Sequence, residues 1–240
     1  MTRDRARVLL IGLGGLGCPA AIALARAGVG EIGLCDDDVV ELTNLHRQIL
    51  FSQADVGTLK LDAAARVLKE INPRLLVRSH RTRLVPENAV RIASEYDVVL
   101  EGSDNFATKF LTADACALAG RPVVHASAVR WVGTALAVGS EGQPCYRCLF
   151  EDIPVDGAPN CADAGVMGPV LGIVAAAQVD FALAMIDGAK AAGHMVTFDG
   201  RSGVFRRRPV PPRPDCPLCS SVPRIRRIEE AAYVSPACVG

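Results

Sequence analysis

Short apolar segments alternate with helix-forming segments along the first half of the chain. Apolar runs that suit buried strands occupy 7–12, 31–35, 75–79, 97–101 and 122–126. Segments with helical spacing lie between and after them at 16–27, 58–71, 86–96 and 106–119. Continuous apolar strands are typical of parallel sheets that helices cover on both faces. The alternation predicts an α/β fold with a Rossmann-like, doubly wound, mostly parallel sheet.

The pattern changes in the second half of the chain. We expect an antiparallel strand at 129–138, a loop at 151–160, and a hairpin of 195–198 with 203–207 around the turn Asp199-Gly200. Antiparallel C-terminal strands therefore extend the sheet. We predict one domain over residues 1–220, followed by a C-terminal tail at 221–240.

The apolar segment at 164–186 is long enough to cross a membrane. Pro169, Gln178 and Asp180 interrupt it, and its glycines make it a poor lipid-facing helix. We therefore expect a buried core helix.

The composition limits the classes of partner. The 240 residues carry 26 basic and 26 acidic side chains, so charge gives no reason to expect nucleic acid or a membrane surface as partner. Half of the residues are hydrophobic, which is enough for a sizeable core. Nine cysteines behind a polar N-terminal segment favour the reducing cytoplasm over a secreted disulfide scaffold.

Two Cys-x-x-Cys pairs lie far apart in the sequence. They are Cys145 with Cys148, and Cys216 with Cys219. Each pair supplies two thiolates, and four thiolates are the ligand set of a structural Zn²⁺ site. The spacing predicts a zinc ion that ties the C-terminal segment to the middle of the chain. Free buried cysteines or a disulfide are the alternative.

A glycine-rich segment follows the first predicted strand. Gly12, Gly14 and Gly17 fit the pattern G-x-G-x-x-G, with Gly15 inside it. Glycines let a phosphate approach the backbone, and the following helix offers free N–H groups. Asp36 stands 19 residues after Gly17 at the end of the second strand, where an acid binds ribose hydroxyls. A solvated turn is the alternative for Asp36 and its two acidic neighbours.

Polar residues after the next strands set this chain apart from a dehydrogenase. Arg47 and Lys60 are suited to bind a triphosphate, and Asp104 at the end of the fourth strand is suited to hold Mg²⁺. Hydride transfer needs neither two cationic side chains nor a metal-binding carboxylate around its cofactor. An NAD-dependent oxidoreductase on the same glycine motif therefore stays the less favoured alternative.

The chain resembles the ThiF/MoeB/HesA family, bacterial relatives of ubiquitin-activating enzymes, and looks closer to ThiF than to MoeB. The similar stretches are VLLIGLGGLGCPAAIALARAGVG, LCDDDVVELTNLHRQILF, GSDN, CYRCLFED, NCADAGVMGPVLGIV, FDGRSGVFR and CPLC. They run from about residue 7 to residue 219 and cover nearly the whole chain.

The resemblance implies a reaction and its partners. Such proteins use ATP and Mg²⁺ to adenylate the C-terminal Gly-Gly carboxylate of a small ubiquitin-like sulfur-carrier protein, as a step toward a thiocarboxylate, and they form homodimers. A thiamin-type carrier and a sulfur donor are the partners expected here. Nucleotide, phosphate or Mg²⁺ contacts are implied for Gly12, Gly14, Gly15, Gly17, Asp36, Asn44, Arg47, Gln48, Lys60, Asp104 and Asn105.

Three positions need separate comment. The family places a cysteine like Cys161 in a loop near the adenylate, with a role in conjugation or sulfur relay; a loop cysteine without chemistry is the alternative. Lys109 stands where relatives often carry arginine, and the N-terminal helices of relatives, with an Arg-Tyr-x-Arg-Gln-like motif, have no counterpart in the sequence. A degenerate relative that binds a carrier without turning over ATP is therefore a further alternative. The carrier and its pathway (thiamin, molybdopterin, cysteine or a peptide natural product) stay open.

Overall fold

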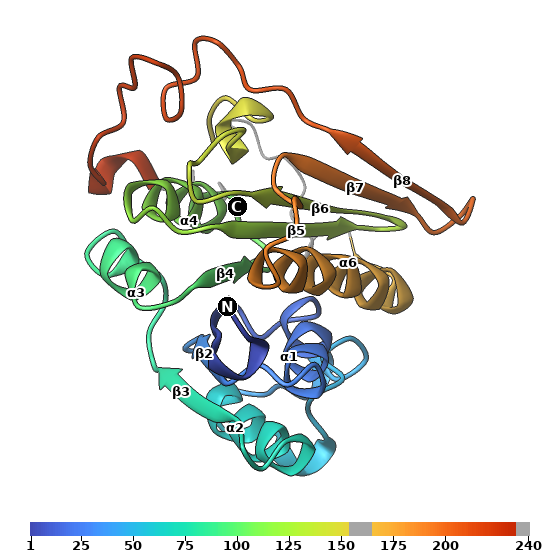
Figure 1. Ribbon diagram of the computed structural model, residues 1–240. Helices are drawn as coiled ribbons and strands as arrows, with labels where there is room; N and C mark the ends of the chain where they lie inside the picture. The colour runs from blue at the N-terminus through green and yellow to red at the C-terminus, as the bar shows by residue number, and fades with distance from the viewer. Residues whose placement is uncertain (154–164, 234–240) are drawn as a thin grey trace.

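The computed structural model describes residues 1–153 and 165–233 and contains one eight-stranded sheet (Figure 1). The strand order is β3-β2-β1-β4-β5-β6-β7-β8. The strands are β1 (Arg7–Ile11), β2 (Glu31–Cys35), β3 (Leu76–His80), β4 (Val98–Glu101), β5 (Val123–Val129), β6 (Val132–Val138), β7 (His194–Asp199) and β8 (Val204–Pro209). β1 to β5 pair in parallel, whereas β6, β7 and β8 join the sheet antiparallel. The predicted sheet, including its antiparallel extension, is confirmed.

Helices cover both faces of this sheet. They are α1 (Gly17–Arg26), α2 (Lys60–Ile71), α3 (Ala89–Ser94), α4 (Phe106–Leu118) and α6 (Gly168–Ile186), with short 3-10 helices η1 (Arg3–Arg5), η2 (Leu42–Asn44), η3 (Gln53–Asp55), η4 (Tyr146–Cys148) and η5 (Glu230–Tyr233). Along β1, Val8 and Leu10 pack in the cluster of α1, α2 and α6, while Leu9 and Ile11 pack in the cluster of α3 and α4. Strand side chains alternate between two cores in this way because a strand has a period of two.

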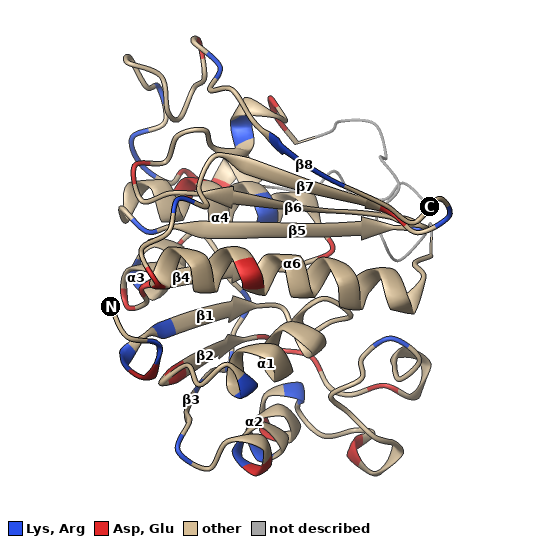
Figure 2. Ribbon diagram, turned by 45° about the vertical axis from the view of Figure 1, so that its right-hand side comes forward, with Lys and Arg blue, Asp and Glu red and all other residues tan. Residues whose placement is uncertain are grey.

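α6 is the long apolar helix, and it lies across the sheet as a core helix. It is the one helix among the described residues that is long and apolar enough to span a membrane, and half of the tested window is buried in the protein. It packs against α1, β4, β5 and β6, and Figure 2 shows it almost free of charged residues. Buried Gln178 donates to the carbonyl oxygens of Glu101 and Val124, at 2.9 and 2.8 Å. These bonds fix α6 on the sheet, as expected for a core helix.

Several predicted boundaries are wrong by a few residues, and among them β6 begins at Val132 rather than at residue 129. α3 begins at Ala89 rather than at residue 86, because the side chain of Asn88 accepts the Val85 N–H at 3.0 Å and forms a turn before the helix. β5 continues to Val129, and a tight turn with Arg130 at φ 53° leads into β6. Small side chains in both strands let this hairpin extend further than the apolar run suggested.

The C-terminal segment folds back onto α4. The hydroxyl of Tyr233 donates to Asp114 of α4 at 2.7 Å, and Arg147 donates to the same carboxylate. The described part of the tail therefore packs on the body of the protein. A domain boundary at 220 stays a prediction.

Candidate active site

A cavity of about 620 Å³ opens where β1, β2 and β4 end. Parallel strands present their carboxyl ends at one edge of the sheet, and the order reverses between β1 and β4, which is where open α/β sheets bind ligands. Most of the sequence-predicted binding residues line this cavity: Gly12, Gly14, Gly15, Asp36, Asn44, Arg47, Gln48, Lys60, Asp104 and Asn105.

The glycines of the first turn have separate tasks. Gly12 has φ 84°, which favours glycine. At Gly14 an added Cβ would meet no atom within 4 Å, so the backbone there is open to a ligand. At Gly17 a Cβ would lie 2.0 Å from the carbonyl oxygen of Gly12. Gly17 is thus required for packing of α1 against the turn and is not among the residues that line the cavity.

Asp36 connects two backbone segments beside the cavity through its carboxylate. One carboxylate oxygen accepts the backbone N–H of Leu13 at 2.7 Å, and the other accepts that of Asp38 at 2.9 Å. These bonds orient the carboxylate and join the glycine turn to the end of β2. The remaining lone pairs are available to hydroxyl groups of a ligand.

Lys60 is paired within the protein. It is buried, and its ammonium lies 2.8 Å from the carboxylate of Asp38, which is half exposed. Arg83 from the loop after β3 bonds Asp37 at 2.9 Å and also lines the cavity. Two acids of the predicted cluster are therefore partnered by bases, which excludes a fully solvated turn.

The segment after η2 supplies a second wall. Arg47 lines the cavity half-buried, and Asn44 donates to Glu41 at 3.0 Å. Gln48 is buried, and its Oε1 has no hydrogen-bond partner among residues 1–153 and 165–233. A buried acceptor without a donor is costly. A ligand hydroxyl or a metal-bound water would satisfy it.

Asp104 and Asn105 follow β4 and differ in role. Asp104 is exposed to the cavity. The side chain of Asn105 accepts the Thr108 N–H at 2.8 Å and caps the N-terminus of α4. Asn105 thus positions the helix that begins beside Asp104.

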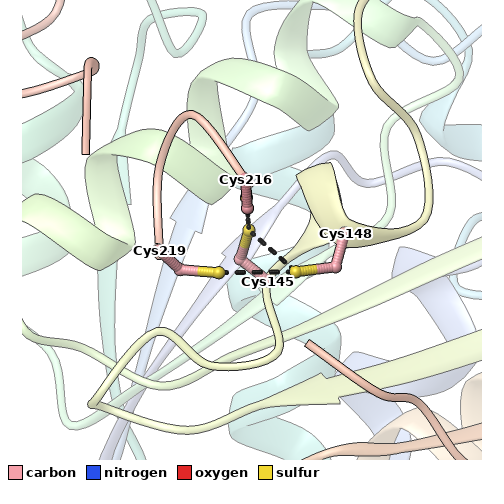
Figure 3. A group of neighbouring side chains, drawn as sticks. All are labelled: Cys145, Cys148, Cys216 and Cys219. Carbon is pink, nitrogen blue, oxygen red and sulfur yellow. Dashed lines mark hydrogen bonds between the residues drawn. The ribbon is translucent and has the colours of Figure 1, made fainter. Parts of the chain in front are cut away.

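The four cysteines of the two Cys-x-x-Cys pairs come together, as Figure 3 shows. Neighbouring sulfur atoms lie 3.9 Å apart for Cys145 and Cys148, and 3.4 Å apart for Cys145–Cys216 and Cys148–Cys219. Four thiolates at about 2.3 Å from one Zn²⁺ stand about 3.8 Å apart. The backbone N–H of Arg213 also donates to Cys148 Sγ at 3.3 Å, which suits a ligand thiolate. The cluster fits a tetrahedral metal and contains no disulfide.

The other cysteines divide into two groups. Cys18, Cys35 and Cys116 are buried, and burial raises the pKa of each thiol, as expected for core residues. Cys161 lies outside the described residues, so its predicted role in sulfur relay stays a prediction.

Sequence reasoning missed a charged group beneath the cavity. Glu101, the last residue of β4, is fully buried, and it bonds Lys109 and His125. The acid at the end of an apolar strand was a signal that a partner must exist, because unpaired charges are not buried. Arg83 was also missed, since nothing in the spacing links it to Asp37.

Comparison with known proteins assigns the family. Residues 3–218 match the ThiF family. The chain belongs to the ThiF family. The adenylyltransferase and sulfurtransferase MOCS3 of Anopheles gambiae is 40% identical over 228 residues, which are 93% of this chain and 52% of that protein. MOCS3 of Mus musculus is 43% identical over 229 residues, 94% of this chain and 50% of that protein. This ThiF-family chain spans about half the length of the curated relatives.

Solved structures share the fold. E. coli MccB superimposes with a TM-score of 0.81 at 23% identity, and the match covers 92% of this chain and 66% of that one. A structure of MccB with ATP gives a TM-score of 0.77, also at 23% identity. At this identity the likeness concerns the fold of the ThiF-family chain alone.

Proposed function

We propose that the protein is an adenylyltransferase that activates the C-terminal carboxylate of a small ubiquitin-like sulfur-carrier protein with ATP. The observation that carries the proposal is the cavity itself. It gathers an open glycine turn, Arg47, Lys60 and Asp104 at one end of a parallel sheet. The names of the similar MOCS3 proteins, adenylyltransferase and sulfurtransferase, support the same reaction.

The reaction requires positioning and charge neutralisation. An oxygen of the carrier carboxylate attacks the α-phosphorus of ATP, the bond to the bridging oxygen of the β-phosphate breaks, and pyrophosphate leaves. Gly14 and Gly15 hold the phosphates against the start of α1, and Asp36 accepts ribose hydroxyls. Arg47 and Lys60 neutralise the leaving charge. No covalent nucleophile of the protein is needed.

The residues present fit a magnesium ion. Asp104 presents an exposed carboxylate to the cavity, and Oε1 of Gln48, which has no partner among the described residues, can accept from a metal-bound water. Mg²⁺ would neutralise phosphate charge when it is bound. We propose Asp104 as its ligand, with Asn105 fixing the adjacent helix.

The zinc site has a different role in the proposal. Four thiolates leave no open coordination position, so Zn²⁺ at Cys145, Cys148, Cys216 and Cys219 stabilises the fold and takes no part in adenylation.

The identity of the carrier is the finer part of the proposal. The motifs favour a thiamin-type carrier, but the comparisons give this assignment no support, since the similar proteins reported above are named MOCS3. A carrier that ends in Gly-Gly is the common chemical requirement. The same proposal includes a homodimer, a sulfur donor, the cytoplasm as compartment and a sulfur-relay role for Cys161. Cys161→Ser is expected to leave adenylation intact and to impair only a later sulfur step.

Carrier-dependent exchange of pyrophosphate into ATP tests the function. Exchange with a Gly-Gly-ending carrier, lost when the terminal glycine is removed, is the expected result. Binding of Mg²⁺·ATP and carrier without exchange would favour a degenerate binding protein. Binding of NAD in place of ATP would favour an oxidoreductase.

A further inference from the structure

A fully buried carboxylate lies directly beneath the loop that carries Asp104. Glu101 Oε1 accepts the backbone N–H of Ser103 at 2.7 Å and the hydroxyl of Ser103 at 2.5 Å. Ser103 immediately precedes Asp104, and the capping residue Asn105 immediately follows it. The loop is therefore anchored on both sides of the proposed Mg²⁺ ligand.

The second oxygen of Glu101 belongs to a buried charged group. Oε2 accepts from Lys109 Nζ at 2.8 Å and lies 3.3 Å from His125 Nδ1. Lys109 also donates to the carbonyl oxygen of Ala126 at 2.7 Å, which joins α4 to β5. All three side chains are buried. The group is thus held by two strands and one helix.

The charges in this group are assigned by burial and contact. Burial opposes ionisation of Glu101, but the nearby Lys109 ammonium and the hydrogen bonds outweigh it and hold the pKa of Glu101 below its usual range. Burial lowers the pKa of His125, so its imidazole is neutral at pH 7 and donates from Nδ1. The result is one ion pair with a neutral donor beside it.

Stability alone does not account for such a group. An apolar pair of similar volume often serves a core as well as a buried ion pair does. The Glu101 backbone is also fixed, because Gln178 of α6 donates to its carbonyl oxygen at 2.9 Å. A rigid carboxylate that bonds a ligand loop is suited to position that loop.

We propose that Glu101 is a positioning residue, which with Lys109 sets the place of Asp104 through the bonds to Ser103. The inference rests on the proposed function, in which Asp104 is the ligand of the Mg²⁺ ion that accompanies ATP. Misplacement of a reacting group by about 1 Å can cost about 100-fold in rate. Partners behind a metal ligand typically contribute 10- to 100-fold in metal affinity or activity.

The test replaces the ion pair as a unit. Glu101→Met with Lys109→Met removes both charges and the bonds to Ser103. It leaves no orphaned charge in the core, but the buried Nδ1–H of His125 loses its acceptor. We expect a folded protein with a lower melting temperature, because a buried donor without its acceptor is destabilising. We also expect the Mg²⁺ concentration for half-maximal pyrophosphate exchange to rise about tenfold or more, with ATP affinity in EDTA unchanged. Lys109→Arg keeps the charge and is expected to keep the wild-type Mg²⁺ dependence.

A second buried ion pair provides the matched control. Asp114 of α4 pairs with Arg147 at 2.8 Å, and its hydrogen bonds go to Arg147 and Tyr233 rather than to Ser103. Asp114→Leu with Arg147→Met is expected to change stability and to leave the Mg²⁺ dependence unchanged. A folded Glu101→Met, Lys109→Met variant with wild-type Mg²⁺ dependence overturns the proposal, and so does an equal effect of the control pair.

Hydrogen exchange separates this proposal from the proposed function. The amide of Ser103 is expected to lose protection in the Glu101→Met, Lys109→Met variant and to keep it in the control, whether or not the wild type is active. Retained protection overturns the positioning role. Absence of exchange activity in the wild type, with protection lost as expected, overturns the proposed function alone.

If the double variant does not fold, Ser103→Ala takes its place, because it removes only the 2.5 Å bond. A raised Mg²⁺ requirement in Ser103→Ala supports the proposal, and an unchanged requirement overturns it.

Discussion

Lys60 and Asp38 form an ion pair on the wall of the cavity, with Lys60 Nζ 2.8 Å from Asp38 Oδ2. The lysine is buried and the aspartate is half exposed. The ammonium proposed to contact phosphate is therefore shared with a protein carboxylate before ATP arrives. ATP must compete with Asp38 for it or bind beside it.

Asp38→Asn should tighten ATP binding. The change keeps the shape of the side chain and removes both the competitor for Lys60 and a negative charge near the triphosphate. A partly exposed pair is worth up to about 1 kcal/mol, so the Kd for Mg²⁺·ATP should fall by up to about fivefold. Calorimetry measures this. Lys60→Met is the matched opposite change and should weaken binding; weaker binding in both variants would mean that the pair acts as a unit.

Cys216→Ala should lose the zinc ion. Three thiolates hold Zn²⁺ less well than four, and the C-terminal segment is tied to η4 through this site. Elemental analysis should show less than one Zn²⁺ per chain, with a lower melting temperature. Cys116→Ala, a change at a buried cysteine of α4, is the control and should keep the metal. Wild-type protein without zinc would contradict the assignment.

Asp114→Ala should destabilise the protein strongly. Asp114 is fully buried, and it accepts hydrogen bonds from Arg147 and from Tyr233. Its loss leaves the buried guanidinium of Arg147 without its closest carboxylate, and breaking a buried ion pair in this way typically costs about 3–5 kcal/mol. Denaturant unfolding measures the change. Glu229→Ala, at an exposed ion pair with Arg227, should have little effect. Equal effects of the two variants would contradict this view of Asp114.

The protein should lose stability in acid partly through Asp55. Backbone and side-chain hydrogen bonds from Ser52 hold the pKa of Asp55 below its usual range. The unfolded chain, with a pKa near 3.9, then binds more protons than the native state in the interval between the two values. Stability from this group is complete above about pH 4 and is lost as the pH falls through the native pKa. In Asp55→Asn the free energy of unfolding should depend less on pH below about 4. If the free energies of unfolding of the wild type and of Asp55→Asn fall in parallel with pH, Asp55 makes no such contribution.

Much of the fold could be predicted from the sequence because local patterns decide it. The run at β1 is apolar and ends at Gly12, which allows one strand and one turn. Asp36 and Asp104 come together because each follows a parallel strand, and the carboxyl ends of parallel strands share an edge. The cluster of four cysteines could be predicted because two Cys-x-x-Cys pairs are the spacing that a tetrahedral metal site requires.

Other features depend on contacts that no local pattern encodes. Lys60 reaches Asp38 because the loop between them closes through a bridge of Val39 with Leu59. Glu101 ends the strand β4 and Lys109 lies in the helix α4, so no single periodic pattern relates the two residues. The helical pattern at 86–96 could not show that the side chain of Asn88 delays the start of α3.

Pyrophosphate exchange by Asp104→Ala and Arg47→Ala tests the central claim most directly. Removing one group that stabilises transition-state charge typically costs about 100- to 1000-fold in rate. Both variants should therefore lose nearly all carrier-dependent exchange, while circular dichroism, zinc content and carrier binding remain those of the wild type. Arg227→Ala, at an exposed arginine of the C-terminal segment, should exchange like the wild type. Near wild-type exchange by folded Asp104→Ala and Arg47→Ala would contradict the account.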